Sequence, residues 1–93
     1  RRMSPTYGQH FKIILSEKNN KSLWIPPGFA HGFAALEENT IFSYKCTGLY
    51  NKLSEGTIAW NDKDLNINWD VKNPLISEKD LISVSFKHFE SEF

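Results

Sequence analysis

Alternation of apolar and polar side chains is the feature of this sequence that most restricts its fold. In "FAHGFAAL" (29–36), Phe29, His31 and Phe33 share one face of an extended chain, and small residues fill most of the other. "LNINW" (65–69) alternates apolar residues with two asparagines in the same way. Successive side chains of a β-strand point to opposite faces, so a period of two belongs to strands. The pattern therefore predicts strands rather than helices.

Turn sequences divide the chain into several such extended segments. Pro27-Gly28 is expected to form a turn with the glycine at positive φ, and "EKNNKS" (17–22) a polar turn. Only "SEKDLISVSF" (77–86), with Ser77 as its N-cap, indicates a helix. The 93 residues are thus predicted to form one all-β domain, a sandwich, jelly roll or barrel, with a short C-terminal helix. The expected strands are 11–16, 23–26, 29–36, 40–46, 56–60 and 65–69.

Charge and composition exclude several classes of partner. The 11 basic and 11 acidic side chains give a net charge of zero, whereas nucleic-acid binding needs an excess of Lys and Arg. Apolar runs such as "IIL" and "FAAL" are far shorter than the roughly 20 residues of a membrane-spanning helix. We therefore expect neither nucleic acid nor a membrane as a partner. The single cysteine, Cys46, fits a reducing cytoplasm, and its side chain is expected to be a small apolar group in the core.

Few residues support metal or nucleophilic chemistry. The three histidines, His10, His31 and His88, are far apart without a His-x-His pair, so no metal site is predicted. The remaining chemistry is proton transfer, for which an imidazole and a phenol in aromatic surroundings, those of His31 and Tyr44, serve as base and acid. The residues leave an alternative open, in which both are hydrogen-bonded members of an aromatic core. Asp80 likewise either serves a site or caps the expected helix.

The order of several motifs resembles one enzyme family. "SPTYGQ", "LSEKNNKSLWIPPGFAHGF", "FSYKCTGLY", "EGTIAWND" and "LISEKD" follow one another as in the C-terminal half of the dTDP-4-dehydrorhamnose 3,5-epimerases. These are cupin-fold enzymes that epimerise nucleotide-linked 4-keto-6-deoxysugars in rhamnose-type deoxysugar biosynthesis. The resemblance spans almost the whole chain. It implies a cupin-type jelly roll of which residues 1–93 form the C-terminal half, and a homodimer that binds a nucleotide-sugar without a metal or cofactor.

The resemblance also implies roles for individual residues. Epimerisation beside a C4 ketone needs a base that removes a proton from C3 or C5 and an acid that returns one on the opposite face. Tyr44 matches the tyrosine that is the family's acid, and Asp80 matches the aspartate of its His–Asp dyad. These two are the expected catalytic residues. His31, Lys45 and Tyr50 are expected to contact the nucleotide-sugar.

Three departures from the family pattern limit this interpretation. The base histidine belongs to an upstream "RGLH" motif, and this chain begins at "RRMSPTYG". These residues alone are therefore expected to be inactive without an upstream half, the alternative being a non-catalytic cupin module or truncated remnant that binds a nucleotide-sugar. Asp70 stands where the family usually has proline, which alters a turn. Leu49 replaces a frequent tyrosine, which leaves open the exact sugar and the choice between 3,5- and 3-only epimerisation.

Overall fold

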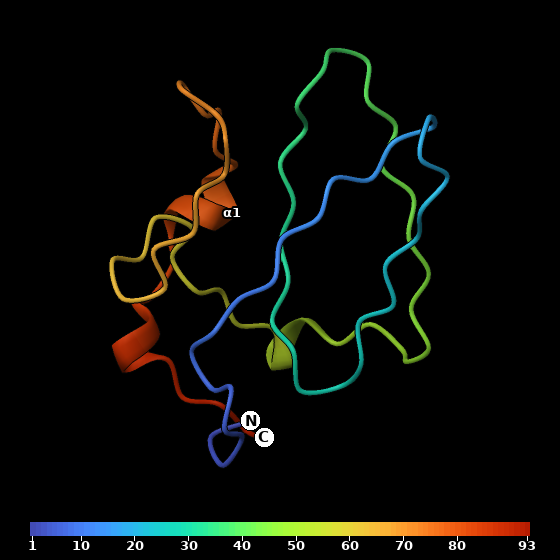
Figure 1. Cartoon of the computed structure of the whole chain (residues 1–93). Coiled ribbons are helices and arrows are strands. Elements are labelled where there is room, and N and C mark those ends of the chain that lie inside the picture. The colour runs from blue at the N-terminus through green and yellow to red at the C-terminus, as the bar shows by residue number, and fades with distance from the viewer.

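A computed structural model describes all 93 residues as a chain with little regular structure. Its helices are the 3-10 helix η1 (Lys52–Ser54), the α-helix α1 (Glu78–Leu81) and the 3-10 helix η2 (Phe86–His88). No helix has the length and apolar character needed to cross a bilayer. The first half of the chain runs in long open loops on one side, and α1 and η2 lie on the other (Figure 1). The two ends of the chain meet, where the Arg2 N–H donates to the Phe93 carbonyl at 3.1 Å.

The predicted all-β jelly roll is wrong for this structure, because no β-strand forms. One isolated parallel bridge pairs Ile58 with Val84. In it the Ala59 N–H donates to the Val84 carbonyl at 2.8 Å, and the Val84 N–H donates to the Thr57 carbonyl at 3.1 Å. The whole backbone makes 15 internal hydrogen bonds, whereas folded domains make roughly one hydrogen bond per residue, about two-thirds of them within the backbone. Apart from this bridge in 56–60, no N–H or C=O group of the predicted strand segments has a ladder partner.

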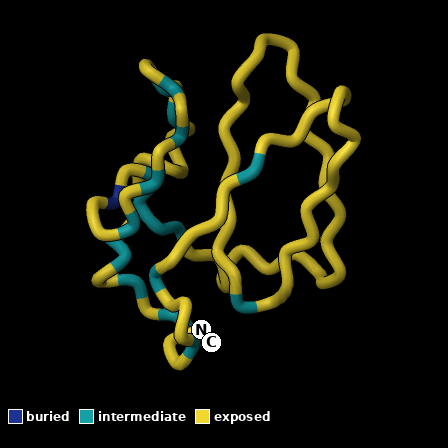
Figure 2. The backbone as a smooth tube through the Cα atoms, viewed as in Figure 1, coloured by how far each residue is buried: buried dark blue, intermediate teal, exposed yellow.

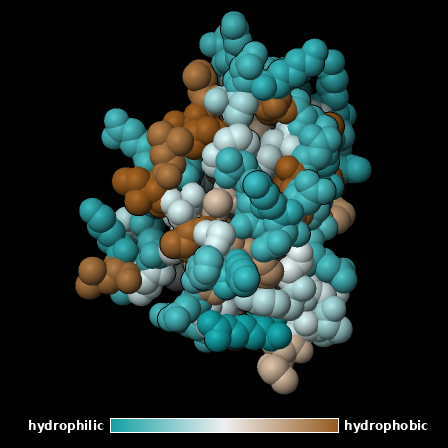
Figure 3. Space-filling view, turned by 90° about the vertical axis from the view of Figure 1, so that its left-hand side faces the viewer, coloured by the Kyte–Doolittle hydropathy of each residue, from teal (hydrophilic) through white to brown (hydrophobic).

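Burial also differs between the first and the second half of the chain. Asp62 is the one buried residue, at 8% exposure, and exposed positions dominate the first half (Figure 2). Half-buried residues concentrate in 57–60 and within 65–71 and 83–91. Cys46 is exposed, so its predicted place in a core is wrong. Apolar side chains also meet solvent among polar ones on the side where α1 lies (Figure 3).

Several predictions of turns and caps are confirmed, although the predicted strands do not pair. Gly28 adopts φ +93° in the predicted Pro27-Gly28 turn, and Asn20 adopts φ +51° at the end of the turn over 17–20. Ser77 caps α1, as predicted, although the helix is shorter than the segment that indicated it. Burial along 65–69 alternates as predicted, with its three apolar residues half-buried and its two asparagines exposed, although Asn66 adopts φ +46° and the segment is not a strand.

Two aromatic rings lie directly against glycines where distant segments meet. A Cβ atom on Gly32 would lie 3.1 Å from the Trp69 ring, and one on Gly56 would lie 2.9 Å from the Phe89 ring. The Trp69 indole N–H donates to the Trp60 carbonyl at 2.7 Å, which fixes the ring that Gly32 approaches. The "AHGF" sequence therefore uses its glycine to bring the first half of the chain against the second.

The turn after Trp69 departs from the proline-containing turn that the family resemblance implies. Asp70 adopts φ +57°, which proline cannot, since its ring fixes φ near −65°. The Lys12 Nζ lies 2.6 Å from Asp70 Oδ2 and donates to the Asn68 carbonyl at 2.9 Å. The hydrogen bond from Lys12 lowers the pKa of Asp70. The aspartate thus belongs to a turn closed by a lysine from the first half of the chain.

Candidate functional site

The first group of predicted site residues lies along a row of aromatic rings. Phe33 and Phe42 stack with ring centroids 3.8 Å apart and planes at 9°. Phe42 meets Tyr44 with centroids 5.5 Å apart and planes at 36°. The row joins the predicted segments 29–36 and 40–46 through the stacked rings of Phe33 and Phe42. Tyr44 is 72% exposed, and it is therefore not the buried core aromatic of the alternative interpretation.

His31 and Lys45 belong to the same two segments and are exposed. The exposure of His31 contradicts its alternative assignment as a core histidine. The two ion pairs of the chain, Lys12–Asp70 and Lys79–Glu55, involve neither residue. Both side chains are therefore open to a ligand, and contact with a nucleotide-sugar stays a prediction for each.

Asp80 forms the second group with the residues around α1. The Asp80 N–H donates to Ser77 Oγ at 3.2 Å, and the Ser77 hydroxyl donates to Asp80 Oδ2 at 2.7 Å. Ser77 is thus the N-cap of α1, and the Asp80 carboxylate at the third helical position accepts the hydroxyl proton of that cap, whereas in a capping box it would accept the backbone N–H. Asp80 therefore has the capping contact that its alternative interpretation describes. The contact uses Oδ2 and fixes the carboxylate, which leaves Oδ1 for another donor.

An ion pair connects α1 with the loop that follows Tyr50. Lys79 Nζ lies 2.8 Å from Glu55 Oε2. The hydrogen bond from Lys79 lowers the pKa of Glu55, and the Tyr50 hydroxyl adds to the effect. In turn, the hydrogen bond to Glu55 raises the pKa of Lys79, and Tyr50 and Asp80 add to the effect. Tyr50 and Asp80, far apart in the sequence, therefore both influence the same ammonium group.

Sequence reasoning missed Glu55 and Lys79 as members of this group. Both stand inside quoted motifs, "EGTIAWND" and "LISEKD", but their pairing depends on how the chain folds between them. The one available signal was the position of Lys79 directly before Asp80.

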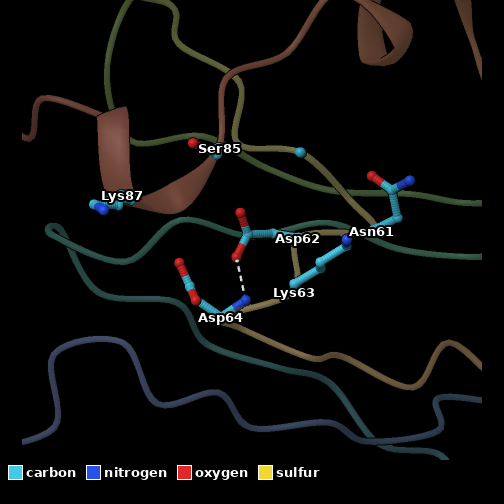
Figure 4. Close-up of a pocket in the computed structure, with 7 residues that line it drawn as sticks. Asn61, Asp62, Lys63, Asp64, Ser85 and Lys87 are labelled. Carbon is cyan, nitrogen blue, oxygen red and sulfur yellow. Dashed lines mark hydrogen bonds between the residues drawn. The ribbon is translucent and has the colours of Figure 1, made fainter.

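The most enclosed carboxylate belongs to neither group. Asp62 Oδ1 accepts hydrogen bonds from the N–H groups of Leu65 at 2.9 Å and Asp64 at 3.0 Å. Its Oδ2 accepts from the Phe86 N–H at 2.8 Å. These backbone hydrogen bonds, that of Leu65 first, lower the pKa of Asp62. One side chain thus holds the turn after Trp60 against η2 (Figure 4).

An open pocket of about 420 Å³ surrounds Asp62. None of the predicted catalytic or substrate-binding residues lines it. Because backbone N–H groups occupy both carboxylate oxygens, Asp62 is a structural residue rather than a proton acceptor. No group of three or more His, Cys, Asp or Glu side chains is arranged to hold a metal ion. The pocket is lined by Ala59, Asn61, Asp62, Lys63, Asp64, Ser85 and Lys87.

Comparison with known proteins decides the family. The family model of dTDP-4-dehydrorhamnose 3,5-epimerase matches residues 1–88. The chain belongs to this family. The dTDP-4-dehydrorhamnose 3,5-epimerase of Shigella flexneri is 46% identical over 86 residues, which cover 92% of this chain and 48% of the relative. Those of Salmonella typhimurium and Pseudomonas aeruginosa are each 48% identical over 81 residues, which cover 86% of this chain and 44% and 45% of the relatives.

The match confirms the resemblance to the dTDP-4-dehydrorhamnose 3,5-epimerase family that the motifs predicted. All five predicted site residues lie inside the matched range 1–88. The chain spans about half the length of the curated epimerases it matches, 48% for the Shigella flexneri enzyme. No solved structure matches the chain. Family membership therefore rests on the sequence.

In this member of the epimerase family, the amide protons of Leu65 and Phe86 are expected to titrate with Asp62 below the usual range of an aspartate. A carboxyl whose folded pKa is depressed stabilises the fold fully above its unfolded pKa of about 3.9. That contribution is lost as the pH falls through the lower folded pKa. An NMR titration of the two amide shifts measures the midpoint. Asp62→Asn should abolish the transition, and a midpoint at or above about 4 would contradict these hydrogen bonds to the Asp62 carboxylate.

Proposed function

We propose that the polypeptide to which these residues belong is a dTDP-4-dehydrorhamnose 3,5-epimerase. It acts on a dTDP-linked 4-keto-6-deoxyhexose in rhamnose-type deoxysugar biosynthesis in the cytoplasm. The observation that carries the proposal is the family match over residues 1–88. Relatives 46% and 48% identical to this chain bear that name, which supports the same reaction here.

The reaction exchanges a proton at a carbon beside a ketone. The C4 carbonyl acidifies the C–H groups at C3 and C5, so a base removes one proton and leaves an enolate whose charge rests on the C4 oxygen. An acid then delivers a proton to the opposite face of the same carbon and restores the ketone. One proton leaves and one arrives at each carbon, and no electrons are gained or lost.

Tyr44 is proposed as the acid, and Asp80 as the partner of the histidine that serves as the base. The exposed phenol at the end of the aromatic row supports the first role, because its proton is open to a ligand. The fixed carboxylate of Asp80, with Oδ1 outside the capping contact, supports the second. The base histidine is proposed to lie in the part of the relatives that this chain does not cover. His31, Lys45 and Tyr50 are proposed to contact the nucleotide-sugar.

Residues 1–93 are proposed as the C-terminal part of one epimerase domain that acts as a homodimer. Support comes from the share of the relatives that the chain covers, 44% to 48% for three of them. Large apolar side chains also face solvent, among them Phe11 at 76%, Trp24 at 74% and Ile41 at 93% exposure. Burial of such side chains between two subunits would contribute roughly 25 cal/mol per Å² of apolar area.

Deuterium exchange tests the proposed reaction. The full-length protein is incubated in ²H₂O with the dTDP-linked 4-keto-6-deoxyhexose, and the sugar is followed by mass spectrometry and NMR. The expected result is deuterium at both C3 and C5, with none when residues 1–93 are used alone. Binding of the nucleotide-sugar by the full-length protein without exchange at either carbon would instead support a non-catalytic binding module. Deuterium at C3 alone would identify a 3-epimerase.

A further inference from the structure

We propose that Glu55 and Lys79 act as one positioning unit that holds Tyr50 and Asp80 in register for the reaction. This inference rests on the proposed function, because it concerns the residues that carry the chemistry there. Glu55 and Lys79 touch neither substrate nor reacting atoms in this role. They act through the two residues that do.

The ion pair joins two turns whose own geometry is already fixed. Glu55 ends η1, where its N–H donates to the Lys52 carbonyl at 3.3 Å. Asn51, which directly follows Tyr50, caps the start of η1 by accepting the Leu53 N–H at 3.1 Å. Capping leaves each turn little freedom of its own, so a bond between the turns fixes their relative position.

No other polar contact joins these two turns. The bond from Lys79 Nζ to Glu55 Oε2, at 2.8 Å, is the one hydrogen bond or ion pair between 50–55 and 77–81. Lys79 is the immediate neighbour of Asp80 in α1, so the bond to Glu55 anchors the turn that carries the Asp80 carboxylate. Loss of the pair therefore frees the Tyr50 loop and the Asp80 helix from one another.

Because the Glu55–Lys79 pair is partly exposed, its effect on turnover can be distinguished from its effect on stability. The side chains of Glu55 and Lys79 are 33% and 62% exposed. Exposed ion pairs contribute little to the free energy of unfolding. By contrast, a displacement of about 1 Å at a catalytic group costs as much as 10²-fold in rate. Breaking the pair should thus change turnover and leave the unfolding temperature almost unchanged.

The charges around the pair keep it formed near neutral pH. The hydrogen bond between the two side chains lowers the pKa of Glu55 and raises that of Lys79, so both stay ionised. Lys52 also lowers the pKa of Glu55, Asp80 also raises that of Lys79, and Tyr50 acts on both in the same directions.

The test uses the full-length enzyme and a double-mutant cycle. Glu55→Gln and Lys79→Met should each lower kcat for exchange at C3 and C5 by roughly tenfold, with a thermal midpoint within about 2 °C of wild type. The double variant should be no slower than either single variant, because both remove the same contact. Lys79→Arg, which retains the ion pair, should keep kcat within about twofold of wild type. Glu78→Gln removes an equal charge from α1 without touching the pair and serves as the matched control.

Several results would overturn this inference. One is a kcat for Glu55→Gln within about twofold of wild type. Another is a double variant in which the two losses multiply, because independent residues behave in that way. If kcat falls only in variants whose thermal midpoint also falls, the pair stabilises the fold and does not position the site. A wild-type enzyme without exchange would overturn the proposed function first and this inference with it, so the two failures are distinguishable.

Discussion

Replacing Tyr44 by phenylalanine is expected to lower epimerisation by about 100-fold or more, because a positioned general acid contributes roughly 10² to 10⁴ in rate. The substitution removes the proposed proton donor and keeps the ring. The contact with Phe42, at a centroid distance of 5.5 Å, is retained, and the 72% exposed side chain loses little buried surface. Stability should therefore be unchanged. Steady-state kinetics of the full-length enzyme, with thermal unfolding followed by circular dichroism, measures both quantities.

Tyr7→Phe is the matched control for this prediction. Tyr7 also packs beside a phenylalanine, with its ring centroid 5.1 Å from that of Phe86, and is 39% exposed. The same hydroxyl is removed there, outside the predicted site. The two variants should differ in turnover by about two orders of magnitude. Equal rates for Tyr44→Phe and Tyr7→Phe would remove Tyr44 from the reaction.

Side-chain alternation predicted which residues share a face, but not what lies beside each extended segment. Alternation placed Phe33 on the face of His31, and placed Phe42 and Tyr44 together on one face of 40–46; the structure brings the three rings into one row. A strand, however, needs a partner for its backbone N–H and C=O groups, and this depends on contacts between distant segments. Only Ile58 and Val84 find such a partner. The faces were therefore predictable and the jelly roll was not.

The same distinction applies to the candidate site. The contact between Ser77 and Asp80 was predictable because a spacing of three residues brings a cap and its partner together in any helix. The Glu55–Lys79 pair and the hydrogen bond from Phe86 to Asp62 join residues whose distance is set by the whole fold. Neither periodicity nor local propensity encodes such pairs. Motif order identified the family because it compares whole stretches of sequence and needs no contact map.

Replacing Asp80 by asparagine is expected to reduce deuterium exchange by about 10² to 10⁴-fold, the range for loss of acid–base function. The substitution removes the negative charge that makes the dyad basic. An amide oxygen can still accept the Ser77 hydroxyl, which donates to Asp80 Oδ2 at 2.7 Å, so the start of α1 should be preserved. Exchange at C3 and C5 and the thermal midpoint of the full-length enzyme are the two measurements.

Ser77→Ala separates the two roles of Asp80. It removes both hydrogen bonds between the Ser77 hydroxyl and Asp80, at 2.7 and 3.2 Å, and leaves the carboxylate charge in place. Loss of an N-cap costs about 1 kcal/mol of stability, so the thermal midpoint should fall by roughly 4 to 8 °C. Its exchange rate should nevertheless stay within about tenfold of wild type, because the base keeps its charged partner. Asp80→Asn should give the opposite pattern, a slow enzyme of normal stability. If Asp80→Asn instead unfolds as Ser77→Ala does and keeps its rate, Asp80 is a helix cap and the catalytic carboxylate lies elsewhere.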